Sequence, residues 1–452
     1  MNLDPATMTS FVRFLFAFTI GSHILLVSTS VALVVIISTA EFLSIRRNDR
    51  IYETLARRLS KVFVVSFGIG TASGIVMAVE LSALFPSFMT LVTETGVITL
   101  LYFEAFAFFI EILALTLYVY YWNAFRSRYT HWVVSLFVLA GTLTSAILIT
   151  MFNAWMNSPT GFDISAYIAS GFKTISQIQP WAAFLTPTTG AEVVHVLSTT
   201  VFAGTMIIGC YFAYWFLKSR DVGEKAMMSK ALKIIGVVGI VTILLGGLTG
   251  SNEMATLLTN QPLKYAALDA NVNPGSNLPE TLFGSYSNGN FVGGIVIPGA
   301  QSLLAQMETG VSALPGLSQF PASTWPPLLV HTTFDVMVGG AVLLALYFLV
   351  YLVALMLKKS PYESRRLLSL WIPLGVLAVV VYELGWATDE IGRQPWIVYN
   401  VMTVSQAANT SSALLVPGIL IVIFYLLVVP AGFYFYAKVF RGSAAEPGGA
   451  GN

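Results

Sequence analysis

Four side chains able to ligate iron lie in or beside apolar stretches of the 452-residue sequence, namely His23, His195, Met337 and Glu383. Histidine, methionine and carboxylate are axial ligands that a membrane-buried haem can use, and none of them requires cysteine. A His–Met pair from two facing helices would fill both axial positions of a low-spin, electron-transferring haem. A lone His or Glu would leave one position open for oxygen.

Simpler interpretations of the same residue types stay open. A buried histidine such as His23 could hydrogen-bond a neighbouring helix, and Met337 is one of 14 methionines, which commonly serve packing. His131, at the inner mouth of its apolar run, is expected to be interfacial. His331 is expected to form a local ion pair with Asp335, four residues further on.

Two carboxylates, Glu104 and Glu111, are seven residues apart in one apolar run. This spacing places them on one helix face about two turns apart, an arrangement that suits a proton relay, although either could instead pair with a helix terminus. Glu192-Val-Val-His195 matches the Glu-x-x-His of di-iron bundles. Because such a centre needs two copies and the sequence has one, we discount a di-iron site.

The elements that must position these residues are membrane helices. Hydrophobic residues make up 56% of the chain and charged residues only 10%, against roughly a quarter charged in soluble proteins. The single cysteine, Cys210, excludes a disulfide framework, a thiolate zinc site, an iron–sulfur cluster and c-type haem attachment. A net charge of +1 disfavours nucleic acid as a partner.

Apolar runs of about 20 residues are needed to cross a bilayer, and nine such runs predict an all-α polytopic membrane protein. None alternates strictly, so they are helices and not barrel strands. The predicted spans are 14–40, 62–85, 97–121, 132–151, 191–217, 234–250, 328–357, 368–388 and 413–436.

The distribution of Lys and Arg predicts the orientation of the chain. Nineteen of the 23 basic residues fall in alternate connections and the C-terminal tail, and only Arg13, Lys173, Lys264 and Arg393 fall on the other side. The positive-inside rule therefore predicts an outside N-terminus and a cytoplasmic C-terminus. The N-terminus carries Asp4 and no basic region, so we expect no cleavable signal peptide.

These runs divide the chain into four parts. Residues 1–250 hold helices one to six with an outer loop at 154–190, and residues 251–326 form a long Gly-, Pro- and Asn-rich outer loop. Residues 327–440 hold helices seven to nine, and 441–452 are expected to be a disordered tail. In the outer half of the bilayer, beneath the long loop, we expect one site formed by His23, Glu104, Glu111, His195, Met337 and Glu383.

Several motifs in this order resemble subunit I of the cytochrome bd quinol oxidases. The strongest is Gly-Arg-Gln-Pro-Trp at 392–396, preceded by Glu-Leu-Gly-Trp at 383–386. Others are Ala-Phe-Phe-Ile-Glu at 107–111, Asn-Ala-Trp-Met-Asn-Ser-Pro at 153–159 and Gln-Pro-Leu-Lys-Tyr-Ala-Ala-Leu-Asp at 261–269. Arg13 with His23 ten residues later, His195 and Met337 complete the resemblance, which runs through most of the chain.

The resemblance implies a cofactor set of low-spin haem b, high-spin haem b and haem d, of which the haem d is left open. His195 and Met337 would be the axial ligands of the low-spin haem. His23 and Glu383 would each bind one of the other two haems, and which ligand serves which haem stays open. Trp386 would lie between haems.

The resemblance also implies roles for the remaining site residues. Arg393 and Gln394 would brace the haem environment, and Lys264 and Asp269 would contact the quinol. Glu104 and Glu111 would carry protons toward the oxygen site.

This sequence departs from the family pattern as well. The two glutamates are usually eight apart, Asp269 stands where the family has Glu, and an Arg two residues before the ligating Met is replaced by Asp335.

From this resemblance we expect a multi-pass protein of the cell membrane. It would oxidise quinol on the outer side and reduce O2 to water with cytoplasmic protons, without pumping protons. Its partners would be a homologous subunit II, with small single-span subunits as a further option, membrane quinol, O2 and the lipid bilayer. One alternative is a haem oxidase of the same fold that uses another donor or lacks haem d. A secondary transporter is a third hypothesis, but the sequence has none of the internal repeats that are typical of transporters.

Overall fold

The computed structural model describes residues 4–287 and 290–442, and long helices dominate this part of the chain. Nine helices within it are long and apolar enough to span a membrane, which confirms the predicted all-α architecture. They are α1 (Pro5–Arg46), α2 (Arg50–Leu84), α4 (Ile98–Tyr120), α5 (Arg128–Asn157), α8 (Thr189–Lys218), α9 (Val222–Asn260), α12 (Leu329–Met356), α13 (Arg365–Gly392) and α15 (Leu415–Gly442).

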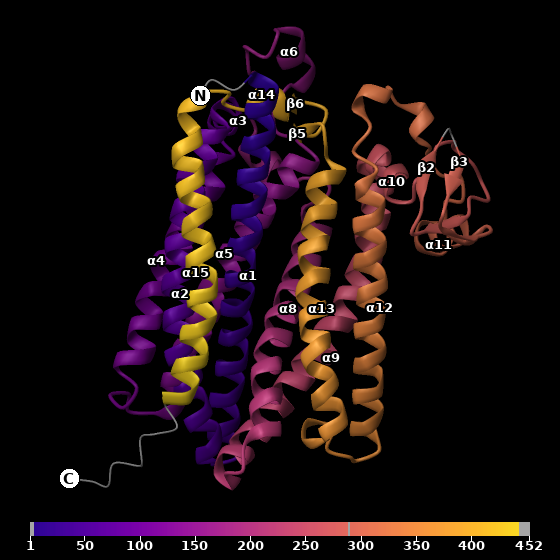
Figure 1. Ribbon diagram of the computed structural model, residues 1–452. Coiled ribbons are helices and arrows are strands. Elements are labelled where there is room, and N and C mark those ends of the chain that lie inside the picture. Colours follow the sequence, from indigo (N-terminus) through magenta and orange to yellow (C-terminus); the bar gives the residue numbers. More distant parts are fainter. Residues whose placement is uncertain (1–3, 288–289, 443–452) are drawn as a thin grey trace.

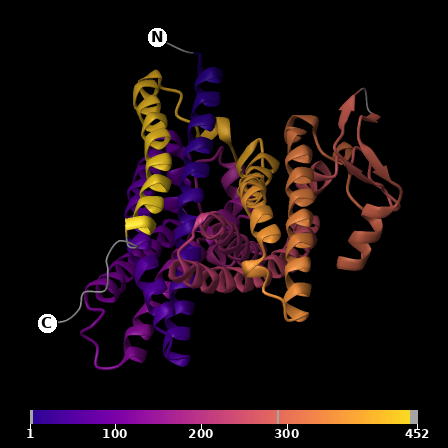
Figure 2. The ribbon, with the colours of Figure 1, turned by 60° about the horizontal axis from the view of Figure 1, so that its bottom comes forward.

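The nine helices run along one common direction, and α1 lies at the centre of the packing (Figure 1). It contacts α2, α5, α8 and α15 directly. Figure 2 shows α8 between α1 and α13, with α12 beyond α13 on the side of the long loop, and these neighbours are in contact. Because α1 touches both halves of the bundle, residues on its opposite faces can take part in two different sites.

Several helices extend further than the hydropathy pattern predicts, among them α1, α2, which begins at Arg50 and not at residue 62, and α9. α1 begins at Pro5 and not at residue 14, because Asp4 accepts hydrogen bonds from the backbone N–H groups of Ala6 and Thr7 at 3.0 Å and Pro5 occupies the first helical position. α9 continues to Asn260 and not to residue 250. Its last turns pack against α10 and α11, so protein contacts and not lipid support them.

Short elements cap the ends of the bundle. Four 3₁₀ turns occupy Leu317–Gln319, Ala322–Thr324, Pro361–Glu363 and Ser412–Leu414. The remaining short elements are α3 (Pro86–Glu94), α6 (Ile164–Ala169), α7 (Pro180–Phe184), α10 (Pro262–Leu268), α11 (Ala300–Thr309), α14 (Val404–Ala407), β5 (Trp396–Val398) and β6 (Met402–Thr403). Figure 1 places α3, α6, α14 and the β5–β6 pair at the end of the bundle where α1 begins.

The long loop has structure of its own. After α10, two nested antiparallel pairs form a ribbon in which β1 (Glu280–Leu282) pairs with β4 (Ile295–Ile297) and β2 (Ser285–Ser287) with β3 (Asn290–Val292). Buried residues of α9, α10, α11 and α12 form a small core beneath it, including Leu257, Tyr265 and Val330. The expected tail, from residue 443 onward, lies outside the described residues.

We predict that Gly204→Ala lowers stability, whereas Gly247→Ala does not. A Cβ at Gly204 on α8 would lie 2.0 Å from the carbonyl oxygen of Ser28 on α1, whereas a Cβ at Gly247 on α9 would meet nothing within 4 Å. Overpacking of this kind costs about 1–3 kcal/mol. Thermal unfolding in detergent should show a lower Tm for Gly204→Ala only; equal values for both variants would contradict the tight α1–α8 contact.

Candidate functional site

His23 on α1 is oriented by Ser73 on α2. The hydroxyl of Ser73 donates to the carbonyl oxygen of Gly70 at 2.8 Å, so it accepts the 2.8 Å hydrogen bond from Nδ1 of His23. The ring proton is therefore on Nδ1, and the lone pair of Nε2 is the potential metal donor. Gly74 lies against this ring edge, because a Cβ there would be 3.2 Å from Cε1 of His23.

His195 on α8 has the same arrangement with α9. The Thr249 hydroxyl donates to the carbonyl of Leu245 at 2.8 Å and accepts from Nδ1 of His195 at 3.1 Å. Nε2 of His195 is again the potential metal donor. A Cβ at Gly250 would lie 3.3 Å from Cε1 of this ring, so a glycine follows the orienting hydroxyl residue in both cases.

Met337 on α12 and Glu383 on α13 also face glycines of neighbouring helices. A Cβ at Gly385 would lie 3.3 Å from Sδ of Met337, and a Cβ at Gly21 would lie 3.0 Å from Oε2 of Glu383. All four predicted ligands therefore contact a glycine on an adjacent helix. Any larger residue there would press directly on the ligand side chain.

The residues present fit haem groups. The donor set of two imidazoles, a thioether and a carboxylate suits haem iron. Among the described residues, Arg393 Nε, Trp396 Nε1 and Glu383 Oε1 are buried and have no hydrogen-bond partner. Buried polar atoms are normally paired, and the carboxylates of a haem would satisfy the two N–H donors.

Arg393, which follows α13 directly, is almost completely buried at 1% exposure. It donates from Nη1 to Oδ1 of Asn157 at 2.7 Å and from Nη2 to Oε2 of Glu390 at 2.6 Å. Gln394 follows it half-buried, and Trp386 lies half-buried on α13, one turn beyond Glu383. The guanidinium thus ties the end of α13 to the end of α5.

Lys264 and Asp269 face different partners. Lys264 on α10 is 2% exposed and forms an ion pair with Asp389 of α13, and a Cβ at Gly392 would lie 2.8 Å from its side chain. Asp269, which follows α10, accepts a 2.5 Å hydrogen bond from Nε2 of Gln301 on α11. The sequence predicts both residues as quinol contacts. In the structure, Lys264 instead holds α10 against α13 through its ion pair with Asp389.

Sequence reasoning missed the acidic groups around this ion pair. Glu192 of α8 accepts from Nδ2 of Asn157 at 3.1 Å, and the same amide lies 3.2 Å from Oδ1 of Asp389. Glu253 of α9 is also partly enclosed, and its Oε2 lacks a hydrogen-bond partner within the described residues. A signal was present in Glu192, three residues before His195, and in Asn157 within a recognised motif.

The predicted local ion pair between His331 and Asp335 is confirmed, with Nε2 3.3 Å from Oδ2. Nδ1 of His331 donates to the carbonyl of Leu268 at 2.6 Å, and Asp335 accepts from the backbone N–H of Phe283 at 2.7 Å. The pair therefore joins α12 to α10 on one side and to the β-ribbon on the other.

Glu104 and Glu111 lie on the face of α4 that packs against α5. Ser145 donates to Oε1 of Glu104 at 3.2 Å, and Thr142 donates to Oε1 of Glu111 at 2.6 Å. Gly141 permits this approach, because a Cβ there would lie 2.8 Å from the Cβ of Glu111. The expected common helix face is confirmed, and each carboxylate has a hydroxyl partner on the same neighbour.

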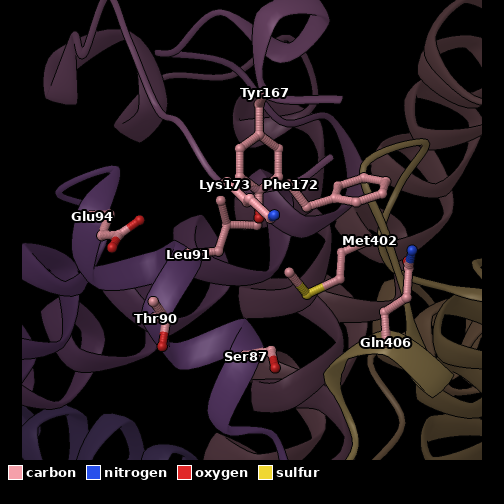
Figure 3. Close-up of a pocket in the computed structure, with 9 residues that line it drawn as sticks. All are labelled: Ser87, Thr90, Leu91, Glu94, Tyr167, Phe172, Lys173, Met402 and Gln406. Carbon is pink, nitrogen blue, oxygen red and sulfur yellow. The ribbon is translucent and has the colours of Figure 1, made fainter. Parts of the chain in front are cut away.

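A separate surface pocket of about 400 Å³ lies among the short elements at the end of the bundle (Figure 3). Its lining includes Glu94, Tyr167, Lys173, Met402 and Gln406. None of the predicted site residues lines it, so it is distinct from the candidate site.

Comparisons with known proteins show which proteins this chain is similar to. A family model described as cytochrome bd terminal oxidase subunit I matches residues 11–444. One Bacillus subtilis (strain 168) relative, whose name assigns it as subunit I of a cytochrome bd menaquinol oxidase, is 31% identical and covers 95% of this chain and 96% of its own. The cytochrome bd-II ubiquinol oxidase subunit 1 of Escherichia coli (strain K12) is 24% identical, with 95% of each chain covered.

A solved structure shows the same fold. The bd oxidase from Geobacillus thermodenitrificans superposes with a TM-score of 0.87 at 29% identity, and the match covers 96% of this chain and 98% of that one.

We predict that Lys264 and Asp389 are energetically coupled. Lys264→Met leaves Asp389 without its cation, and Asp389→Asn leaves a buried ammonium unpaired, so the double variant should lose less stability than the sum of the two single losses. The coupling free energy of a double-mutant cycle should be about 1–3 kcal/mol. Strict additivity would show that the two groups do not hold α10 to α13.

Proposed function

Because this chain belongs to the family of cytochrome bd terminal oxidase subunit I, we propose that it oxidises membrane quinol at the end of the bundle bearing the long loop and reduces O2 to water with cytoplasmic protons. Release of protons on one side and their consumption from the other would build a proton motive force without pumping. The observation that carries this proposal is the pair of histidines, His23 and His195, whose Nδ1–H groups are held so that Nε2 faces away as a metal donor.

The proposed ligand roles follow the donor set. His195 and Met337 would hold a low-spin haem b from α8 and α12, which both pack close to α13. His23 of α1 and Glu383 of α13 would each hold one of the other two haems, a high-spin b and a haem d. When bound, these groups would transfer electrons one at a time and bind O2. Arg393 and Trp396 would donate hydrogen bonds to the carboxylates of the haems.

Asp269 is the proposed base for quinol. Burial raises the pKa of this carboxyl well above its ordinary value, and the nearby charge of Glu280 raises it further. A carboxylate with a raised pKa is a better proton acceptor near neutral pH. Lys264 would act indirectly, by fixing α10 against α13 so that Asp269 stays in register with the haem ligands.

Glu111 and Glu104 would carry protons along α4 toward the oxygen-reducing end of the bundle. Their hydroxyl partners Thr142 and Ser145 come from one face of α5, so the two helices together supply a line of groups that can donate and accept. The second subunit of the complex would cover part of the exposed apolar surface of the bundle, which includes Phe106, Phe109 and Leu113 on α4.

The proposed function is tested by a dithionite-reduced minus oxidised spectrum of the purified complex, with pyridine extraction to type the haems. We expect bands of haem b and of a chlorin-type haem. His195→Ala should remove the low-spin haem b signal and leave the chain inserted, whereas Val194→Ala on the exposed face of α8 should change nothing. A complex without haem would overturn the proposal, and a retained low-spin signal in His195→Ala would overturn the ligand assignment.

We predict that Asp269→Asn slows quinol oxidation by about 10²-fold or more, the usual cost of losing a general base. Reduction of the haems by dithionite should be unchanged, because that reagent needs no base. The rate loss should shrink as pH rises, since solvent hydroxide then takes the proton. Asn271→Ala, which removes the next hydrogen-bond partner of Gln301, is the control; equal losses in both variants would indicate loop damage and not a lost base.

A further inference from the structure

A second buried polar cluster lies at the opposite, Lys- and Arg-rich end of the bundle. It joins Glu41 of α1, Tyr118 of α4 and His131 of α5, whose exposures are 4%, 2% and 3%. Oε1 of Glu41 is 2.5 Å from Nδ1 of His131, and Oε2 accepts from the Tyr118 hydroxyl at 2.7 Å. His131 lies near the start of α5 and is buried among the three helices.

The hydrogen bonds of this cluster define which proton can move. Nε2 of His131 lies 2.9 Å from the backbone carbonyl oxygen of Tyr118, and a carbonyl oxygen only accepts, so Nε2 carries a hydrogen. The Tyr118 hydroxyl hydrogen points at Glu41. One proton therefore remains between Nδ1 of His131 and Oε1 of Glu41, where either group can hold it.

The cluster continues the stripe of Glu104 and Glu111 along α4. Tyr118 follows Glu111 by the same seven residues that separate Glu111 from Glu104, so the three lie on one helix face at intervals of about 10 Å. The facing side of α5 carries a matching series. Its polar groups, from the basic end outward, are His131, Ser135, Thr142 and Ser145.

Ser135 fills the interval between the cluster and Thr142. Its hydroxyl lies 3.0 Å from that of Ser38 on α1 and donates to the carbonyl of Trp132 at 2.6 Å. The interface of α1, α4 and α5 thus carries polar groups from its basic end to Glu104, although apolar residues dominate all three helices.

Charged groups at the surface enclose the cluster. Arg57 of α2 lies over the Trp122 ring at 4.5 Å, and that ring is 4.3 Å from the ring of His131. Arg128 of α5 donates to the Ser44 hydroxyl at 3.0 Å and pairs with Glu53 of α2 at 3.3 Å. The two arginines and Glu53 are the charged groups that face the cluster from α2 and α5, and Glu41 and Tyr118 face His131 from α1 and α4.

We propose that the Glu41–His131–Tyr118 cluster is the proton-accepting entrance that supplies Glu111 and then Glu104 from the basic end of the bundle. This inference rests on the proposed function of Glu111 and Glu104 as proton carriers. Each transfer moves one proton: the cluster gives its shared proton to Glu111, and solution at the basic end returns one to the cluster. A purely structural role, tying three helices together, is the alternative to be excluded.

Glu41→Gln separates the two roles. The amide keeps the shape and can still accept from Tyr118 and donate to Nδ1 of His131, but it cannot exchange a proton. We expect O2 consumption by the purified complex with a saturating quinol to fall at least about tenfold, with unchanged haem spectra. The solvent deuterium isotope effect on O2 consumption should increase, and the loss of O2-consumption rate should become larger as pH rises. A structural role would leave all three readouts as in the unaltered complex.

Two further variants make the outcomes distinct. Glu224→Gln, at the same end but hydrogen-bonded to Arg58, should keep full turnover. Glu111→Gln should be slow if the proposed proton carriers are correct. A slow Glu111→Gln with full turnover in Glu41→Gln would overturn the entrance alone, whereas full turnover in both would overturn the proposed carriers.

Tyr118→Phe carries the test if Glu41→Gln loses its haems. It removes one hydrogen bond to Glu41 and keeps the ring stacked on His131 at 4.6 Å. We expect slower turnover and a larger isotope effect; unchanged values would overturn the proposed entrance.

Discussion

The interior of a membrane protein offers no water, so each polar group there must find a partner within the protein or remain costly to bury. Within the residues that the structure describes, nine long helices satisfy most of the backbone, and most buried polar side chains have identifiable partners. Glu41 bonds to His131 and Tyr118, and Lys264 pairs with Asp389. Three of the exceptions among the described residues are informative, because Glu383 Oε1, Arg393 Nε and Trp396 Nε1 belong to the motifs in which we expect haem-binding residues.

Glycines also lie at the helix contacts beside the four predicted ligands. Gly74 and Gly250 each follow a hydroxyl residue that holds a histidine, and Gly21 and Gly385 face the carboxylate and the thioether. Each of the four predicted ligands therefore lies against a glycine of a neighbouring helix. Small residues let membrane helices approach closely, and here they also leave the ligand side chains unobstructed. Helix packing and ligand placement are thus set by the same residues.

Sequence patterns were sufficient for the helices and for contacts along one helix. Hydropathy predicts nine spans, and a seven-residue interval correctly places Glu104 and Glu111 on one face. The patterns could not give contacts between distant segments. The pairing of Lys264 with Asp389 spans 125 positions, and the burial of His131 depends on helices α1 and α4. Hydropathy also ended the sixth helix at residue 250, because it does not register the protein contacts that carry α9 on to Asn260.

The two ends of the bundle differ in how their protons can be shared, and this difference argues for a direction of transfer. At the basic end the acidic group Glu41 faces a histidine, so a proton can pass between two groups without creating an unpaired charge. At the other end Lys264 pairs with Asp389, and Arg393 pairs with Glu390. Between them, Glu111 and Glu104 have only neutral hydroxyl partners. An ionised carboxylate without a cation is costly in such surroundings, and a hydroxyl partner can both donate and accept a proton. That is the property required of an intermediate carrier between a supply at one end and a consuming reaction near the other.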